Sequence, residues 1–291
     1  MKKAPFALAL VPFLVGIAVA PLAAQEEKPP TILQIYREMV KFDKDTDHIK
    51  NEQAWAAALA ANKVPPASIG TVTLSGGDEA WFLAGFDSYA DLEKTAQLMQ
   101  GPKYEAFRQK DSELVNEGHG AIARLNEEWS YHLMFDVAHT RYFEVEVIHL
   151  RPGRTADWAQ IAKGDNEAMT KASIDEHDIA YDTEFGEGGH LVYIFTPHKS
   201  LAEIDASNAA QAAFMKSFSD DERKHRTELI QQAVITADAF LLQIVPEMSY
   251  PLDTWIKADP GFWKPKHAPA KAAAAAPSEE KKPAAPPSGA N

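Results

Sequence analysis

Hydrophobic and polar positions follow an order of strand and helix patterns that this chain carries twice. In the first copy, alternation over Thr31–Val40 predicts a strand, and apolar residues then recur at helical spacing. Two short alternating segments, a second helical stretch and a closing strand follow. The second copy repeats this order from a strand at Arg141–Leu150. Repetition of a whole supersecondary unit determines an architecture before it determines a chemistry.

The order of elements in each copy is β-α-β-β-α-β, which is that of a ferredoxin-like domain. Such a domain has helices on one face of its sheet, so the other face must be covered by something else. A tandem copy is the obvious cover. We therefore predict an α+β protein with two tandem ferredoxin-like βαββαβ repeats, at residues 31–135 and 139–250, that form an intrachain α+β barrel.

The N-terminal residues have the layout of a secretory signal peptide, which we place at residues 1–24. Lys2 and Lys3 precede an apolar run from Ala4 to Ala20, and small residues lead out of it. A retained membrane anchor is the alternative, because the run approaches the length of a short spanning helix. We expect cleavage, a periplasmic or secreted protein, and no membrane span afterwards.

The C-terminal residues divide into two parts. Residues 251–264 contain Trp255, Phe262 and Trp263, and we expect this segment to dock on the barrel, because exposed aromatic residues promote aggregation. Residues 265–291 are rich in Ala, Pro and Lys without apolar periodicity, which predicts a disordered tail. That tail is either a solvated spacer or a tether to the cell envelope.

Composition excludes several kinds of chemistry. The chain has no cysteine, which rules out disulfides, thiolate catalysis and iron–sulfur clusters. The net charge is −13, so phosphate backbones would repel the protein and nucleic acid is a poor partner. The sequence leaves the oligomeric state open.

The first strand, Leu33–Val40, and the hairpin segment Gly76–Lys94, with their counterparts in the second copy, resemble the dimeric α+β barrel superfamily. The resemblance is nearest to its NIPSNAP-like and antibiotic-biosynthesis-monooxygenase-like branches. It implies a small-molecule ligand between the sheets, and the superfamily includes cofactor-free monooxygenases, isomerases and haem enzymes. The Gly-x-x-Asp-Gly motif of dye-decolourising peroxidases is missing from this sequence, and we expect no cofactor.

Candidate ligand-binding residues come from strand faces that we expect to line the barrel lumen. Tyr36 and Glu38 share one face of the first strand, and Glu144 and Glu146 share the matching face in the second copy. Polar groups on a covered strand are unfavourable unless paired or hydrated, so these glutamates are candidate bases. Alternatively, they are solvated at the rim.

Two further positions are candidates because the repeat alignment relates them. His190 aligns with Trp81 at the start of the third strand, which suggests a pocket-mouth position for both, although Trp81 also fits a core aromatic. The predicted ligand-binding residues are therefore Tyr36, Glu38, Trp81, Glu144, Glu146 and His190.

Metal ligands and nucleophiles have no recognisable motif. His-x-x-x-His and His-Glu-x-x-His are missing, and Asp43, Asp45 and Asp47 are interpreted as capping and charge at a helix N-terminus. We therefore predict no metal site and assign no catalytic residues.

Three functions remain as hypotheses. The first is binding of a small apolar or aromatic molecule between the two sheets. The second is a cofactor-independent monooxygenase or isomerase that uses a lumen glutamate as its base. The third is a structural envelope protein without a ligand, which a lumen filled by Tyr36, Trp81, Tyr181 and Tyr193 would favour.

Overall fold

The computed structural model describes residues 26–186 and 188–264. The predicted signal peptide, 1–24, and the predicted tail, 265–291, lie outside the described residues. The first copy consists of β1 (Ile32–Val40), α1 (Asp45–Asn62), β2 (Ser68–Thr73), β3 (Glu79–Phe86), α2 (Tyr89–Leu98), α3 (Pro102–Leu114) and β4 (Val115–Leu125). The second consists of β5 (Tyr142–Leu150), α4 (Thr155–Ala172), β6 (Ile179–Gly186), β7 (Leu191–His198), α5 (Leu201–Ser217), α6 (Asp220–Ala233) and β8 (Val234–Ile244).

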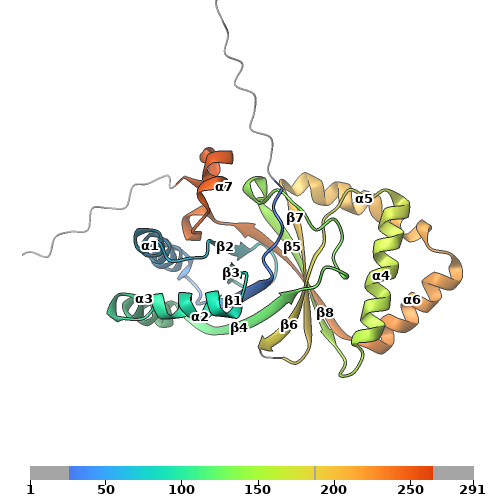
Figure 1. The fold of residues 1–291 in the computed structure, drawn as a ribbon, viewed down its shortest axis with the longest axis horizontal. Coiled ribbons are helices and arrows are strands. Elements are labelled where there is room, and N and C mark those ends of the chain that lie inside the picture. Colours follow the sequence, from blue (N-terminus) through green and yellow to red (C-terminus); the bar gives the residue numbers. More distant parts are fainter. Residues whose placement is uncertain (1–25, 187, 265–291) are drawn as a thin grey trace, which may run out of the picture.

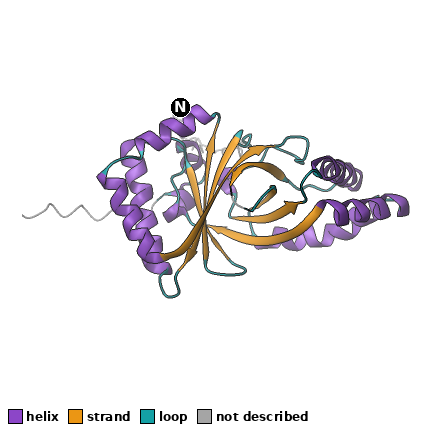
Figure 2. Ribbon diagram, turned by 90° about the horizontal axis from the view of Figure 1, so that it is seen from below, coloured by secondary structure: helices purple, strands orange, loops and turns teal. Residues whose placement is uncertain are grey.

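The strands form one closed barrel in the order β1-β3-β2-β8-β5-β7-β6-β4. The two copies join where β2 pairs with β8 and where β4 pairs with β6, both antiparallel. Helices cover the barrel on opposite sides, α1 to α3 on one and α4 to α6 on the other (Figures 1 and 2). The predicted α+β class and the intrachain barrel of two ferredoxin-like repeats are confirmed.

Aromatic and branched side chains fill the barrel lumen. Trp81 is fully buried there, with its ring centroid 6.4 Å from Tyr193 and 5.2 Å from Phe240. Arg37 lies over the Trp81 ring and donates to Glu79, whose carboxylate also accepts from the Trp81 indole at 2.9 Å. The part of the lumen around Trp81 is therefore packed and contains the Arg37–Glu79 ion pair.

The expected placement of the candidate glutamates in the lumen is wrong. Side chains alternate between the faces of a strand, and the lumen receives Leu33 and Ile35 rather than the residues between them. Tyr36 and Glu38 face α1 and α3, and Glu144 and Glu146 face α4 and α6. The alternation showed which residues share a face but not which face the helices cover.

Helix α1 is positioned by charge at its start and by a left-handed residue at its end. Its N-cap residue Lys44 makes no side-chain capping bond, so the predicted capping by aspartate is wrong, while Asp45 and Asp47 lie in the first turn, where they stabilise the helix dipole. Lys63 adopts φ 50° and donates its backbone N–H to the last turn. Val64 then precedes Pro65, where an α conformation is disfavoured.

The C-terminal segment contains α7 (Asp253–Ala258) and α8 (Pro260–Trp263), which follow a short 3-10 turn, η2 (Pro246–Met248). Trp263 is buried and donates its indole N–H to the carbonyl oxygen of Ala138 at 2.8 Å. Trp255 is buried beside it and donates to Glu27. Among the helices that the structure describes, none has the length and apolar character needed to cross a bilayer.

The two copies can be aligned through their strand pairing. Ile32 faces Phe86 and Tyr142 faces His198, so Phe86 corresponds to His198. The same pairing makes Tyr193 the counterpart of Trp81, so the predicted alignment of Trp81 with His190 is wrong by three residues. The first strands both have nine residues, and α1 and α4 both have 18, so these elements align without gaps.

Candidate functional site

A cavity of about 660 Å³ lies between the helix-covered face of the first sheet and helices α1 to α3; we call it the α1–α3 cavity. Its walls are mainly apolar and aromatic. Trp55 on α1 packs edge-to-face on Tyr104 and Phe107 of α3, with ring centroids 5.5 and 5.7 Å away. Phe82 and Phe86 line the sheet side. The cavity thus has the apolar walls typical of a small-molecule site.

Four titratable side chains gather at one part of this cavity, and we call them the acid–histidine cluster. Glu38 comes from β1, His48 and Glu52 from α1, and Asp111 from α3. The His48 Nε2 atom lies 2.7 Å from Glu38 Oε2 and 3.5 Å from Asp111 Oδ1. One donor atom from each residue falls within 4.8 Å of all the others, so the four could hold a cation.

Burial changes the protonation of the cluster. Desolvation, together with the charges of Glu38 and Asp111, raises the pKa of Glu52 to about 8. Desolvation and Glu38 raise the pKa of Asp111 to about 7. Burial alone would lower the pKa of His48, but its hydrogen bond to Glu38 and the surrounding carboxyl groups raise it overall. At neutral pH the cluster therefore retains protons that the same side chains would lose in water.

The polar atoms and carboxyl charges of the cluster are only partly paired. The buried Asp111 Oδ1 atom has no hydrogen-bond partner. Glu52 accepts from the amide of its neighbour Asn51 at 3.1 Å. Across the part of the chain that the structure describes, no lysine or arginine forms an ion pair with Glu38, Glu52 or Asp111. Three carboxyl groups thus face one histidine.

Tyr36 and Glu38, both predicted ligand-binding residues, lie at this cavity. The Tyr36 hydroxyl lies above Gly118 of β4, where an added Cβ would come within 2.5 Å of it, so a larger residue at 118 would displace the Tyr36 ring. Burial and the charges of Glu38 and Asp111 raise the pKa of Tyr36. The Tyr36 phenol is therefore a neutral donor beside the acid–histidine cluster.

Glu144 and Glu146 lie instead at a second cavity of about 380 Å³ between the second sheet and α4 to α6, the α4–α6 cavity. Arg226 donates to both oxygens of Asp165 there, at 2.6 and 2.8 Å. Burial and the neighbouring Glu144 and Asp165 raise the pKa of Glu146, against the effect of Arg226. Burial raises the pKa of Asp178 to about 7.

The two remaining predicted residues belong to neither cavity. Trp81 is a lumen side chain. His190 lies at the β6–β7 hairpin, where its Nε2 atom is 2.6 Å from Asp182 Oδ1. The six predicted ligand-binding residues are thus divided among four places.

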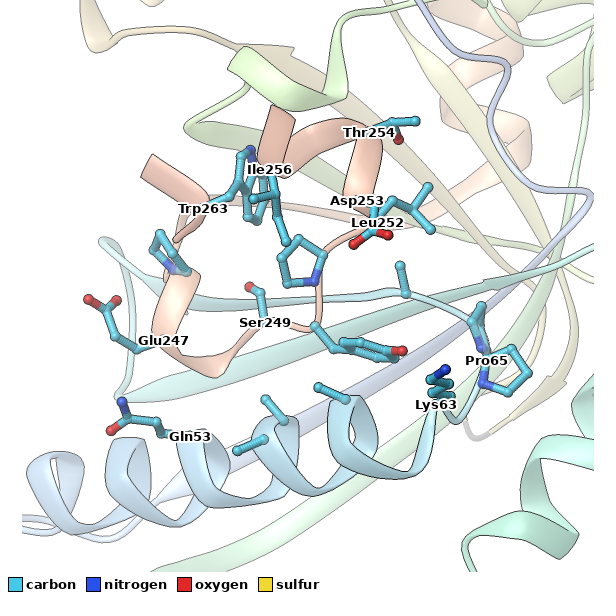
Figure 3. Close-up of a pocket in the computed structure, with 18 of the residues that line it drawn as sticks. Gln53, Lys63, Pro65, Glu247, Ser249, Leu252, Asp253, Thr254, Ile256 and Trp263 are labelled. Carbon is cyan, nitrogen blue, oxygen red and sulfur yellow. The ribbon is translucent and has the colours of Figure 1, made fainter. Parts of the chain in front are cut away.

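A larger hollow, about 1260 Å³, lies between the outer side of α1 and the C-terminal segment (Figure 3). Alanines of α1 form one wall, and Ile256 and Trp263 line the opposite side. The charged residues of its lining, such as Lys63 and Asp253, are exposed or half-buried. None of the charged residues in its lining is buried, so the hollow has no group with shifted chemistry to orient a ligand. The α1–α3 cavity is the stronger candidate.

No protein-family model and no curated protein matches the chain. Among solved structures it is similar to a candidate monooxygenase from Fusobacterium nucleatum, with a TM-score of 0.51 and 12% identity over 73% of this chain and 91% of that chain. It is also similar to an anthrone oxidase-like protein, with a TM-score of 0.53 and 12% identity over 76% of this chain and 94% of that chain. At such identity the likeness shows the fold alone, which is that of a dimeric α+β barrel.

Sequence reasoning missed His48, Glu52 and Asp111. His48 and Glu52 lie one helical turn apart, but a His-x-x-x-Glu pair has no distinctive meaning without a third ligand, and Asp111 is far away in the sequence. A correct alignment of the two copies would have given a signal. The residues that correspond to the acid–histidine cluster in the second copy are all apolar: Ile148, Trp158, Ala162 and Ile230.

Proposed function

We propose that the protein binds a small molecule with an aromatic or aliphatic body in the α1–α3 cavity, with the molecule's polar end at the acid–histidine cluster. The observation that carries this proposal is the combination of apolar walls with a buried group of proton donors and acceptors. Such pockets bind through their apolar surface and orient the ligand through a few polar groups. Figure 1 shows the enclosing helices on the outer side of the barrel.

The lining of the cavity favours an aromatic ligand. Trp55 and Phe107 line it from the helices, and Phe82 lines it from the sheet. Aromatic pairs add specific attraction beyond the area that they bury. The lumen between the sheets offers less room, because Trp81 and Tyr193 fill it.

Binding of 1-naphthol, an uncharged aromatic probe with one polar group, tests this proposal by fluorescence titration of the full chain. Ala84 lines the cavity from β3, so Ala84→Phe should fill it and weaken binding by at least about 10-fold, or about 1.4 kcal/mol. Ala84→Ser adds almost no volume and should bind like the wild type. Equal affinity of wild type and Ala84→Phe, or no saturable binding, would overturn the proposal.

A second candidate function is cofactor-independent proton transfer, as in an isomerase or a cofactor-free monooxygenase. It is favoured by the 2.7 Å contact between Glu38 and His48 beside the cavity, since a base held by a second group is the usual arrangement for general base catalysis. Deuterium exchange at the carbon next to the carbonyl of 2-indanone tests it. Glu38→Gln should abolish exchange above background, while the exposed control Glu105→Gln should not change it.

We also propose that the chain is exported, on the basis of Lys2, Lys3 and the apolar run after them. The experiment is fractionation of cells that express the chain with a C-terminal tag. Protein that remains in the cytoplasm at full length would contradict this proposal.

A further inference from the structure

We propose that the acid–histidine cluster is a binding site for one divalent first-row transition-metal ion, of the Mn²⁺, Fe²⁺ or Zn²⁺ class. Glu38, His48, Glu52 and Asp111 supply four donor atoms that all lie within 4.8 Å of one another. Atoms bound to one ion at about 2.0–2.2 Å lie roughly 3–4 Å apart, so small side-chain movements suffice to close the site.

The elements that carry these residues converge on one point. His48 and Glu52 project from the same face of α1, because residues four apart on a helix are neighbours. Glu38 rises from β1 beneath α1, and Asp111 comes from α3 beside it. Three packed elements therefore fix the positions of the donors, and none of the four donor residues lies in a loop.

The donor types select the class of ion. Carboxylate oxygens alone suit Mg²⁺ or Ca²⁺, whereas an imidazole nitrogen favours transition metals. None of the four donors is sulfur, so the cluster lacks the soft ligands that copper(I) and iron–sulfur clusters prefer. One nitrogen with three carboxylates suits Mn²⁺, Fe²⁺ or Zn²⁺.

One oxygen of the cluster lacks a hydrogen-bond partner. Asp111 Oδ1 is buried without a hydrogen-bond partner, 3.5 Å from the buried imidazole of His48. An unpaired buried acceptor is unfavourable, and more so when it is charged. A divalent ion would satisfy this oxygen and balance the surplus of carboxyl groups over basic partners.

The second copy shows that the fold does not need a polar cluster at this place. Ile148, Trp158 and Ala162 occupy the positions of Glu38, His48 and Glu52, and they belong to a buried apolar core. Replacement of buried charged groups by such residues is often neutral or stabilising. Retention of the cluster in the first copy is therefore explained better by a ligand than by stability.

The site has a route to solvent. Glu38, Glu52 and Asp111 line the α1–α3 cavity, whereas His48 closes the site from behind, only 1% exposed. An ion could enter through the cavity and keep an open coordination position facing it. This proposal extends the cavity's proposed function without requiring an organic ligand, and a bound ion would replace the cofactor-free chemistry of the second candidate.

Isothermal titration of the EDTA-treated full chain with Zn²⁺, and electron paramagnetic resonance of free Mn²⁺, test the site. We expect one ion per chain. Glu52→Gln and Asp111→Asn keep the shape of the side chains and should each weaken binding by at least about 10-fold, the lower range for loss of even an outer-shell partner. Glu52→Ala, which introduces the residue type that the second copy has at Ala162, is the reserve variant if either fails to fold.

Two matched controls separate this site from adventitious binding. Asp178→Asn removes another buried carboxyl whose pKa is also raised to about 7, and Glu105→Gln removes an exposed one on α3. Neither should change the affinity or the stoichiometry. Absence of saturable binding, or equal affinity in all variants, would overturn the metal site, while binding of 1-naphthol would still test the cavity separately.

Discussion

The two copies of the repeat share their backbone order and differ in what lies between sheet and helices. At the four deep positions, where strand and helix approach each other, the first copy has titratable residues and the second has apolar ones: Glu38, His48, Glu52 and Asp111 against Ile148, Trp158, Ala162 and Ile230. Since both arrangements support the same barrel, the fold itself does not require the polar set.

The neighbouring positions show the reverse difference. The first copy has aromatic residues where the second has charged ones: Tyr36, Trp55 and Phe107 against Glu146, Asp165 and Arg226. In the second copy the charged residues lie at these outer positions, where Arg226 pairs with Asp165, and the deep positions are apolar. The first copy keeps its charges deep and its aromatic surface outside, which is the arrangement of a binding cavity.

The largest effect should come from moving the polar chemistry into the wrong copy. Ile148→Glu would bury a carboxyl beside Trp158 and Ala162 without a partner. We expect a loss of about 3–5 kcal/mol in the free energy of unfolding, the range for an uncompensated buried charge. Urea denaturation measures it, and Ile148→Leu should remain within about 1.5 kcal/mol of the wild type. If Ile148→Glu were as stable as the wild type, the deep positions of both copies would accept a charge equally well.

The second effect depends on pH. The pKa of Glu52 is raised to about 8 in the folded protein, above its value in the unfolded chain. The proton is therefore held more tightly when the protein is folded, and stability is full below the unfolded pKa and declines as pH rises towards about 8. In EDTA, Glu52→Gln removes this decline, so the variant should gain roughly 4 kcal/mol over the wild type between pH 5 and pH 9.

The control for that measurement lies on the surface. Glu113 is fully exposed, so Glu113→Gln should leave the pH dependence of unfolding unchanged. If Glu52→Gln and the wild type lost stability in parallel up to pH 9, Glu52 would not be the group that holds the proton.

A smaller effect should follow when the four deep positions of the first copy are given the residues of the second. The variant Glu38→Ile/His48→Trp/Glu52→Ala/Asp111→Ile should equal or exceed the wild type by about 1–4 kcal/mol, because a buried polar group is replaced as a unit. Glu38→Ile alone should be destabilising, since it leaves His48 buried without its 2.7 Å partner. Thermal unfolding in EDTA compares them. A quadruple variant less stable than the single one would show that the cluster holds the fold together.

The smallest effect should arise in the α4–α6 cavity. Asp165→Asn removes the charge that pairs with Arg226, but both side chains are partly hydrated. We expect a loss of about 1 kcal/mol, reduced further by salt, and no change in Zn²⁺ or 1-naphthol binding. Loss of ligand binding in this variant would place the functional site in the second copy instead.

The repeated order of strands and helices could be predicted from the sequence because it depends on periodicity, which local residues carry. The barrel followed because each sheet has a face that needs a cover. The sequence did not show which face of each sheet the helices cover. Gln34, Tyr36 and Glu38 alternate with Leu33 and Ile35, and only the packing of α1 shows which set the helices cover.

The site was partly predictable for the same reason. Glu38 and Tyr36 were recognised as polar residues on a covered strand, and both lie at the α1–α3 cavity. His48 and Asp111 were not recognised, because their meeting depends on how α1 and α3 pack together. The predicted alignment of Trp81 with His190 also hid the contrast between the copies, since the structure makes Tyr193 the counterpart of Trp81.

The joining of β2 to β8 and of β4 to β6 within one chain has an evolutionary consequence. In a symmetric homodimer every substitution occurs in both halves, so a costly polar residue would be present twice. Here the codons for Glu38 and Ile148 can change independently. One half can accumulate residues that favour stability while the other explores ligands, and asymmetry between the halves is therefore open to selection.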